Sequence, residues 1–150
     1  MNGQQFLNLS FLMKRKYDQQ CKPILLEFDL RQSDLDVLIF LAANPCCQTA
    51  REISEYRMLS KSLVSSSVDA LMRRGLLEGK IDPTDRRRVL LTLLPPAQEI
   101  VTRTHELTER YVQHLLSGVT ESDLLAMERM SVQVCRNLEE FDCDALRTDA

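Results

Sequence analysis

The spacing of apolar residues along this chain changes directly after Gly75. Before this glycine, residues 60–74 carry apolar side chains at helical spacing, and glycine is the residue most often found where a helix ends. After it come two short apolar runs, 76–81 and 88–93, separated by a charged segment that contains turn-forming Asp-Pro and Thr-Asp pairs. The sequence therefore predicts a helix followed by a two-stranded hairpin with a long, charged tip.

Helical patterns occupy most of the chain before this point. Residues 4–22 form a predicted first helix, which we expect Pro23 to kink or end because proline has no backbone N–H. The spans Ser33–Asp36 and Thr49–Glu52 have the spacing of a capping box, and they predict the starts of two further helices.

Two long helices are expected after the hairpin, one beginning at Pro95-Pro96 and one capped by Thr120. Their apolar stripes, and the stripe of the first helix, are larger than the rest of the chain can cover. These stripes consist of Phe6, Leu9, Met13, Leu107, Tyr111, Leu115, Val134, Leu138 and Phe141. A second copy of the chain would cover them, so the sequence predicts a homodimer.

The predicted fold class is mainly α with a small β-hairpin wing, in the order of a winged helix-turn-helix. The chain has 150 residues, four glycines and no Gly/Ser linker, so we expect a single domain. Within it, residues 30–94 would form the winged head, and residues 1–29 and 95–150 would form a helical dimerisation region.

Composition excludes several classes of protein. No apolar run approaches the roughly 18 residues of a membrane-spanning helix, and the basic residues near the N-terminus follow the apolar ones, which is the reverse of a secretory signal. Five cysteines with no CxxC spacing favour free thiols in the cytoplasm. No catalytic or metal-binding motif is present, so we expect no enzyme, no cofactor and no metal site.

The charge of the chain is unevenly distributed. Residues 51–92 contain nine Lys/Arg and six Asp/Glu, so this segment carries +3 within a chain whose net charge is −3. A locally basic segment in an acidic chain favours contact with a polyanion. The alternative is a solvated surface on which the charges cluster by chance.

The segment LSKSLVSSSVDALMRRGLLEGKIDPTDRRRVLLTL resembles the MarR family of bacterial transcriptional regulators. Two features carry the resemblance: the L-x-x-x-G-L pattern from Leu71 to Leu76, and the Asp-Pro-x-Asp-Arg-Arg pattern from Asp82 to Arg87. The upstream segment KPILLEFDLRQSDLDVLIFLAANP also looks like the family's link between its first two helices. One departure is Ser66, where many relatives carry arginine.

The resemblance implies a homodimer that places two winged heads in adjacent major grooves of a pseudo-palindromic duplex. By the same resemblance, Asp85 braces Arg87, and Arg87 enters the minor groove. Short hydroxyl side chains on the outer face of the predicted helix would let its backbone approach the DNA and would bond to base edges or phosphates. The expected DNA-binding residues are Ser60, Lys61, Ser62, Ser65, Ser66, Arg73, Asp85, Arg86, Arg87 and Arg88.

A small-molecule site is also expected where the first, second and fifth helices meet. The candidate lining residues are Tyr17, Cys21, Phe28, Phe40 and Tyr111. Apolar walls with a few polar tips suit a small amphipathic or aromatic effector. The same residues could instead fill the core.

The sequence thus predicts a dimeric, sequence-specific DNA-binding regulator, a repressor whose geometry responds to a small ligand. Two alternatives are open. One is a helical dimer that acts through protein contacts and keeps a vestigial winged head. The other is a redox-sensing regulator, in which Lys22 would lower the pKa of the Cys21 thiol.

Overall fold

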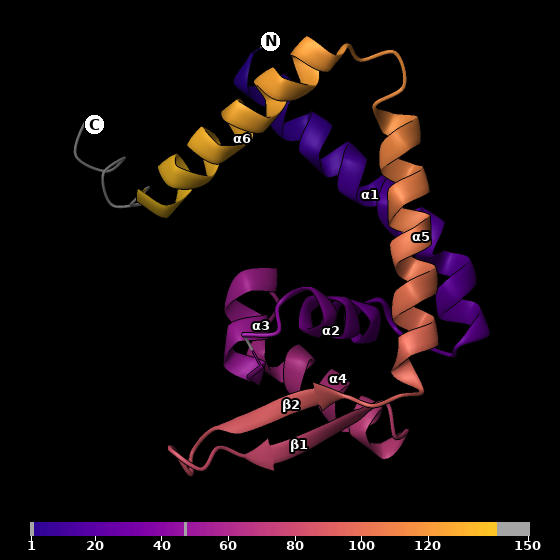
Figure 1. Ribbon diagram of the computed structural model, residues 1–150, viewed down its shortest axis with the longest axis vertical. Coiled ribbons are helices and arrows are strands. Elements are labelled where there is room, and N and C mark those ends of the chain that lie inside the picture. The colour runs from indigo at the N-terminus through magenta and orange to yellow at the C-terminus, as the bar shows by residue number, and fades with distance from the viewer. Residues whose placement is uncertain (1, 47, 141–150) are drawn as a thin grey trace. The chain divides into compact units, whose positions relative to one another are not determined.

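The computed structural model describes residues 2–46 and 48–140. The described residues form six helices and one antiparallel two-stranded sheet (Figure 1). In chain order these are α1 (Gly3–Glu27), α2 (Gln32–Ala43), α3 (Ala50–Arg57), α4 (Lys61–Arg73), β1 (Leu77–Ile81), β2 (Val89–Leu93), α5 (Ala97–Leu115) and α6 (Glu121–Glu140). The predicted fold class, mainly α with a hairpin wing, is confirmed. Contacts divide the chain into two compact units, one ending at Tyr111 and one starting at Val112.

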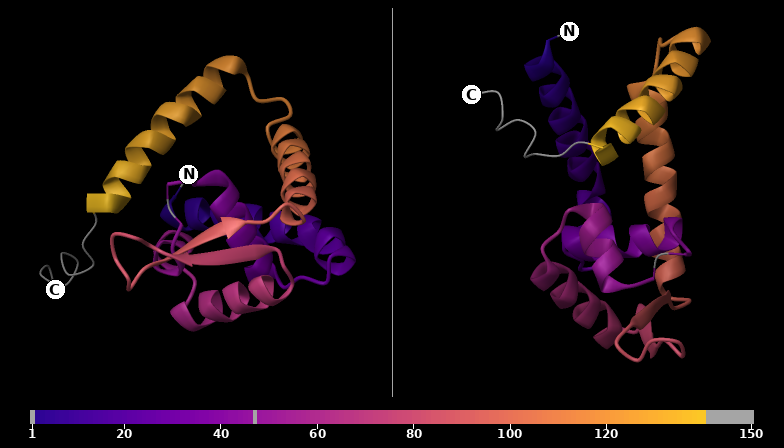
Figure 2. Two further views of the ribbon diagram at one scale, coloured as in Figure 1. Left: turned by 60° about the horizontal axis from the view of Figure 1, so that its bottom comes forward. Right: turned by 90° about the vertical axis from the view of Figure 1, so that its left-hand side faces the viewer.

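The core of the first unit lies between α2, α3, α4 and the hairpin (Figure 2), and buried side chains of α1 and α5 extend it. Each element contributes apolar side chains that are almost fully buried, among them Leu38, Ile53, Leu71 and Leu77. Full burial of one such side chain contributes about 1.5–3 kcal/mol. The helix-turn-helix and the wing therefore share one core, which fixes the position of α4 relative to the hairpin.

Helix α1 runs through Pro23, so of the two predicted effects the ending of the helix at Pro23 was wrong. Proline removes one intrahelical hydrogen bond, but Cys21 and Ile24 on either side of it are buried in the core. This packing holds the segment helical despite the missing bond. The helix ends instead at Phe28, whose N–H donates to the carbonyl of Ile24 at 3.0 Å.

The start of α2 also differs from the prediction. The helix begins at Gln32 after the N-cap residue Arg31, and the carboxylate of Asp34 accepts the Arg31 backbone N–H at 2.9 Å. Asp34 thus accepts the capping hydrogen bond that the sequence predicted for Asp36. Ser33, the predicted cap, is buried and accepts a hydrogen bond from Ser67 of α4 at 2.9 Å.

The predicted capping box of α3 is confirmed. The Thr49 backbone N–H donates to the Glu52 carboxylate at 2.8 Å, and the Glu52 N–H donates to the Thr49 hydroxyl at 3.3 Å. The turn from α3 to α4 passes through Met58, whose φ of 52° lies in the left-handed region. After α4, the predicted helix end at Gly75 is confirmed, and this glycine takes a left-handed conformation, with φ of 67°.

The hairpin pairs Leu77 with Leu93 and Ile81 with Val89. Leu91 is buried, but Val89 is exposed, so the apolar face of the hairpin is covered only near the base of the wing. The reason is that the base of the hairpin covers the core and its distal part does not. Gly79 marks the close approach to the helix, because a Cβ there would lie 2.9 Å from Val89 and 3.3 Å from the Met72 side chain of α4.

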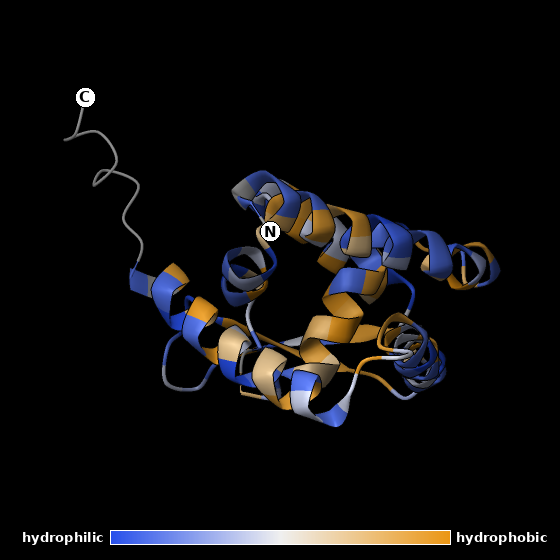
Figure 3. Ribbon diagram, turned by 90° about the horizontal axis from the view of Figure 1, so that it is seen from above, coloured by the Kyte–Doolittle hydropathy of each residue, from blue (hydrophilic) through white to orange (hydrophobic). Residues whose placement is uncertain are grey.

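The second unit contains the end of α5 and all of α6. Thr120 caps α6 as predicted, accepting the Asp123 N–H at 3.3 Å. Apolar and polar residues alternate along α6 (Figure 3), and large apolar side chains such as Leu125, Met130 and Leu138 are exposed. Phe141, predicted to continue this stripe, lies outside the described residues. None of the helices in the described part of the chain combines the length and apolarity needed to span a bilayer.

Candidate nucleic-acid interface

Helix α4 presents a row of hydroxyl groups to solvent. Val64, Val68 and Leu71 are buried on its inner face, whereas Ser62 and the neighbouring serines 65 and 66 are exposed. The cations at its two ends, Lys61 and Arg73, are exposed as well. Ser60 is the N-cap and accepts the Leu63 N–H at 3.3 Å, so its oxygen already has a partner within the protein. The exposed face of α4 therefore carries short side chains in its middle and basic side chains at both ends.

The tip of the wing is held by its own side chains. The Asp82 carboxylate accepts the Thr84 backbone N–H at 2.8 Å and the Thr84 hydroxyl at 2.7 Å. These hydrogen bonds hold the pKa of Asp82 below its usual value. The Asp82 N–H in turn donates to the Arg88 carbonyl at 2.9 Å, which closes the tip across the two strands.

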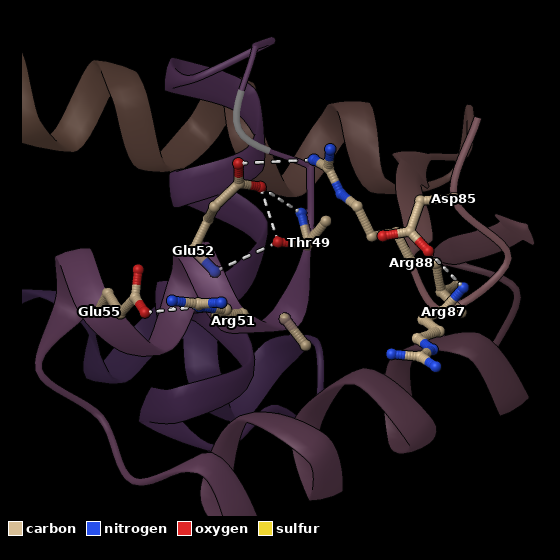
Figure 4. A pocket seen from close by; sticks show the side chains of 9 residues that line it. Thr49, Arg51, Glu52, Glu55, Asp85, Arg87 and Arg88 are labelled. Carbon is tan, nitrogen blue, oxygen red and sulfur yellow. Dashed lines mark hydrogen bonds and ion pairs between the residues drawn. The ribbon is translucent and has the colours of Figure 1, made fainter. Parts of the chain in front are cut away.

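Within the tip, Asp85 fixes the backbone of Arg87. Its carboxylate accepts the Arg87 backbone N–H at 3.0 Å (Figure 4). The guanidinium of Arg87 makes no hydrogen bond or ion pair with any residue in the described part of the chain. The bracing implied by the family resemblance is thus made to the backbone of Arg87 and not to its guanidinium.

Arg88 differs from its two neighbours in the tip. Its guanidinium forms ion pairs with Glu52 of α3 at 3.8 Å and with Asp82 at 3.7 Å. Arg86 and Arg87 are exposed and have no such partners among the described residues. Arg88 was grouped with them as a DNA-binding residue, but the structure gives it acidic protein partners that tie the wing to α3.

A cleft of about 750 Å³ lies between the N-terminal end of α3 and the wing tip (Figure 4). Its lining residues are Thr49, Ala50, Arg51, Glu52, Glu55, Asp85, Arg87, Arg88 and Val89. The acidic groups of this lining are already engaged: Arg51 donates to Glu55 at 2.8 Å, and Thr49 holds the pKa of Glu52 below its usual value by hydrogen bonding. Within the described lining, Arg87 is the cation that has no acidic partner.

Residues 28–88 match the sequence model of the MarR family. This span contains α2, α3, α4, β1 and the whole wing tip. The winged head, residues 28–88, is thus similar to the MarR family. The resemblance noted in the sequence is confirmed.

Solved MarR-family structures share the fold. Transcriptional regulator PA3341 is 22% identical, with a TM-score of 0.79 over 91% of this chain and 99% of that chain. The MepR–DNA complex of S. aureus is 22% identical, with a TM-score of 0.70 over 92% of this chain and 96% of that chain. Apo MarR from E. coli is 22% identical, with a TM-score of 0.66 over 85% of this chain and 94% of that chain.

A curated relative is the uncharacterized HTH-type transcriptional regulator YsmB of Bacillus subtilis. It is 26% identical over 81 residues, which cover 54% of this chain and 56% of YsmB. The matched region therefore spans about half the length of this relative.

Two arginines of the winged head have structural contacts that sequence reasoning missed. The Arg74 guanidinium donates to the carbonyls of Phe28 and Asp29, so it ties the end of α4 to the segment before α2. The Arg31 guanidinium contacts Asp34 and Ser66. The spacing of Arg31 and Asp34, three residues apart across a helix start, is the sequence signal that could have found the second cluster.

Two of the residues predicted to line an effector site pack directly on each other. The rings of Tyr17 and Tyr111 meet edge to face, with centroids 5.6 Å apart. The Tyr17 hydroxyl lies 2.9 Å from the Thr108 hydroxyl, and the Tyr111 hydroxyl donates to the Met13 carbonyl at 2.8 Å. The polar tips that were expected to face a ligand therefore already have partners within the protein.

The other three candidates also have protein contacts. Arg103 stacks over the Phe28 ring at 5.3 Å, and Phe40 packs beside Tyr56 with centroids 5.8 Å apart. Cys21 is fully buried. These contacts favour the packed-core alternative, and an effector site stays a prediction.

The thiol of Cys21 does not have the environment of a redox sensor. Burial raises the pKa of Cys21, so the prediction that Lys22 would lower it was wrong. Lys22 is exposed on the helix surface, whereas the thiol lies in the core. Because the thiolate is the reactive form, a raised pKa disfavours oxidation at this site.

Proposed function

We propose that this chain is a DNA-binding transcriptional regulator that reads a duplex with α4 and the wing. Two observations carry the proposal: the Arg87 guanidinium has no partner among the described residues, and α4 exposes a face of short hydroxyl side chains. Hydroxyls of this kind bond to base edges and phosphates, and a planar guanidinium suits a narrow minor groove. A MarR-family neighbour of the same fold, MepR, has been solved with DNA bound.

In this proposal, α4 and the wing contact different grooves of the duplex. Helix α4 would enter the major groove with Ser62, Ser65 and Ser66 toward the bases. Arg87 would enter the adjacent minor groove from the wing. The cleft between α3 and the wing would then receive the phosphate backbone that separates the two grooves, with Arg87 supplying its unpaired positive charge.

We further propose that the chain acts as a homodimer in the cytoplasm and binds a pseudo-palindromic site. The exposed apolar side chains of α1 and α6 support this proposal, because a lone protomer would leave them in water. Two heads related by a two-fold axis match an operator of the same symmetry.

Selection of bound duplexes from a random pool tests the proposal directly. The full chain is expected to enrich one pseudo-palindromic sequence and to bind it with an affinity that falls steeply as salt rises. A pool that stays random after repeated rounds, together with an affinity that salt does not change, would support the protein-interaction alternative instead.

A further inference from the structure

The Arg31 guanidinium lies against α4 although Arg31 belongs to the start of α2. Its NH1 group donates to the Ser66 hydroxyl oxygen at 3.1 Å, and its NH2 group donates to the Ser66 carbonyl at 3.2 Å. The Arg31 side chain is 49% exposed. A second element therefore contributes a half-exposed cation to the edge of the serine face.

This contact determines what Ser66 can offer to a ligand. A serine hydroxyl has one proton and can act as donor or acceptor by rotation. Because the Ser66 oxygen accepts from Arg31, its proton is free to point away from the guanidinium, toward solvent. Ser66 is thus set as a hydrogen-bond donor on the outer face of α4.

The Arg31 guanidinium is itself held in place by Asp34. The buried Asp34 carboxylate accepts from the Arg31 Nε at 3.1 Å and from its NH2 at 2.7 Å, in the two-point geometry that suits a guanidinium. Beneath this pair, Ser67 donates to Ser33 across the α2–α4 contact at 2.9 Å. Four of the five Arg31 N–H groups have partners in this cluster, which leaves one NH1 hydrogen without a partner among the described residues.

We propose that Arg31 and Ser66 form one donor pair in the DNA interface and bind a single acceptor oxygen or nitrogen of the duplex. The inference rests on the proposed DNA-binding function and extends its interface to α2. The pair offers a free N–H and a free O–H on adjacent groups of fixed geometry, with a positive charge behind them. Little side-chain entropy is lost on binding, because Asp34 already holds the guanidinium.

The acceptor can be a phosphate oxygen or a base edge in the major groove, and two measurements distinguish them. If it is a phosphate, Arg31→Gln weakens binding to all sequences alike. It also reduces the slope of log K against log salt concentration by about one. If it is a base edge, such as guanine O6 or N7, Ser66→Ala relaxes the preference at one position of the selected site.

The test is a double-mutant cycle of Arg31→Gln and Ser66→Ala, read by titration of the full chain on the selected duplex. Each single variant is expected to bind on the order of tenfold more weakly, and the double variant no more weakly than the worse single one, because the pair acts as a unit. Arg103→Gln is the matched control, since Arg103 also pairs with a carboxylate, that of Glu27, but lies on α5. It should bind as wild type.

Arg31 also caps α2, so melting temperatures accompany each titration. Arg31→Lys keeps the charge but loses the planar fork, and it is expected to bind between wild type and Arg31→Gln. If Arg31→Gln fails to fold, Ser66→Ala and Arg31→Lys decide: wild-type affinity in both overturns the inference. Additive weakening in the cycle overturns it too.

If wild type itself shows no salt-sensitive binding, the proposed function fails. If Arg87→Ala weakens binding and Arg31→Gln does not, only this inference fails.

Discussion

The carboxylate of Asp85 accepts a hydrogen bond from the backbone N–H of Arg87 at 3.0 Å. An aspartate that bonds to the backbone two residues ahead fixes the local turn. The bond therefore sets the direction in which Arg87 leaves the wing tip, and the guanidinium keeps all its donors without a partner among the described residues. This arrangement separates two roles of Asp85 that the sequence alone could not separate, orientation of the backbone and pairing with the guanidinium.

Replacement of Asp85 by asparagine or alanine should give opposite results. Asparagine keeps a side-chain oxygen that can accept the Arg87 N–H and removes a negative charge near phosphates, so Asp85→Asn should bind the selected duplex at least as tightly as wild type. Alanine has no such acceptor, so Asp85→Ala should bind more weakly even though it also removes the charge. Titrations at two salt concentrations measure both. Equal weakening by the two variants would mean that Asp85 acts by charge on the guanidinium.

Arg87→Ala should weaken DNA binding by about 1–3 kcal/mol for each bond that the guanidinium makes to the duplex. The melting temperature should stay that of wild type, because the guanidinium has no partner within the described chain. Arg110→Ala is the charge-matched control. Arg110 is exposed and lies about 20 Å from the start of α5, at a helical rise of about 1.5 Å per residue. Unchanged binding by Arg87→Ala would remove the wing from the mechanism.

The first unit is expected to depend on a second copy of the chain for stability, as is the second. Exposed apolar residues on α1, such as Phe11, and on α6, such as Leu125, would be buried in a homodimer. The melting temperature should therefore rise with protein concentration. Sedimentation of a folded monomer at micromolar concentration would contradict this prediction.

The elements that local signals specify were predictable from the sequence. The Thr49–Glu52 capping box, the Gly75 helix end and the strands of the wing each depend on residues within a few positions of one another. Pro23 and Ser33 were misread because packing decides them: Cys21 and Ile24 hold α1 helical, and Ser33 bonds to Ser67, which is 34 residues away in the sequence. The local spacing of Arg31 and Asp34 indicates their ion pair, but the contact of Arg31 with Ser66 depends on the packing of α2 against α4, which no local pattern reveals.

The Arg31–Asp34 pair should make stability depend on pH. Burial alone would raise the pKa of Asp34, but the hydrogen bonds from the side chain and backbone of Arg31 outweigh it, and the pKa is lowered. A lowered pKa contributes stability that is present above the unfolded-state value of about 3.9 and is lost as the pH falls through the folded-state value. Relative to Asp34→Asn, wild type should thus be more stable at neutral pH, and the difference should shrink below about pH 4. Denaturant titrations of both proteins across this range measure it; a constant difference would contradict the assignment.

Met58→Gly should stabilise the protein. Met58 holds a left-handed backbone conformation, with φ of 52°, and it is 92% exposed, so the residue has strain and little packing to lose. A non-glycine residue in this region costs roughly 1–2 kcal/mol, and the greater freedom of glycine in the unfolded chain offsets about 0.5–1 kcal/mol of the gain. We therefore expect a net increase of up to about 1.5 kcal/mol in the free energy of unfolding, measured as a higher urea midpoint at unchanged slope. Met58→Ala is the control, because it keeps the Cβ and with it the strain. If alanine and glycine at this position have the same midpoint, the left-handed conformation is not the source of the effect.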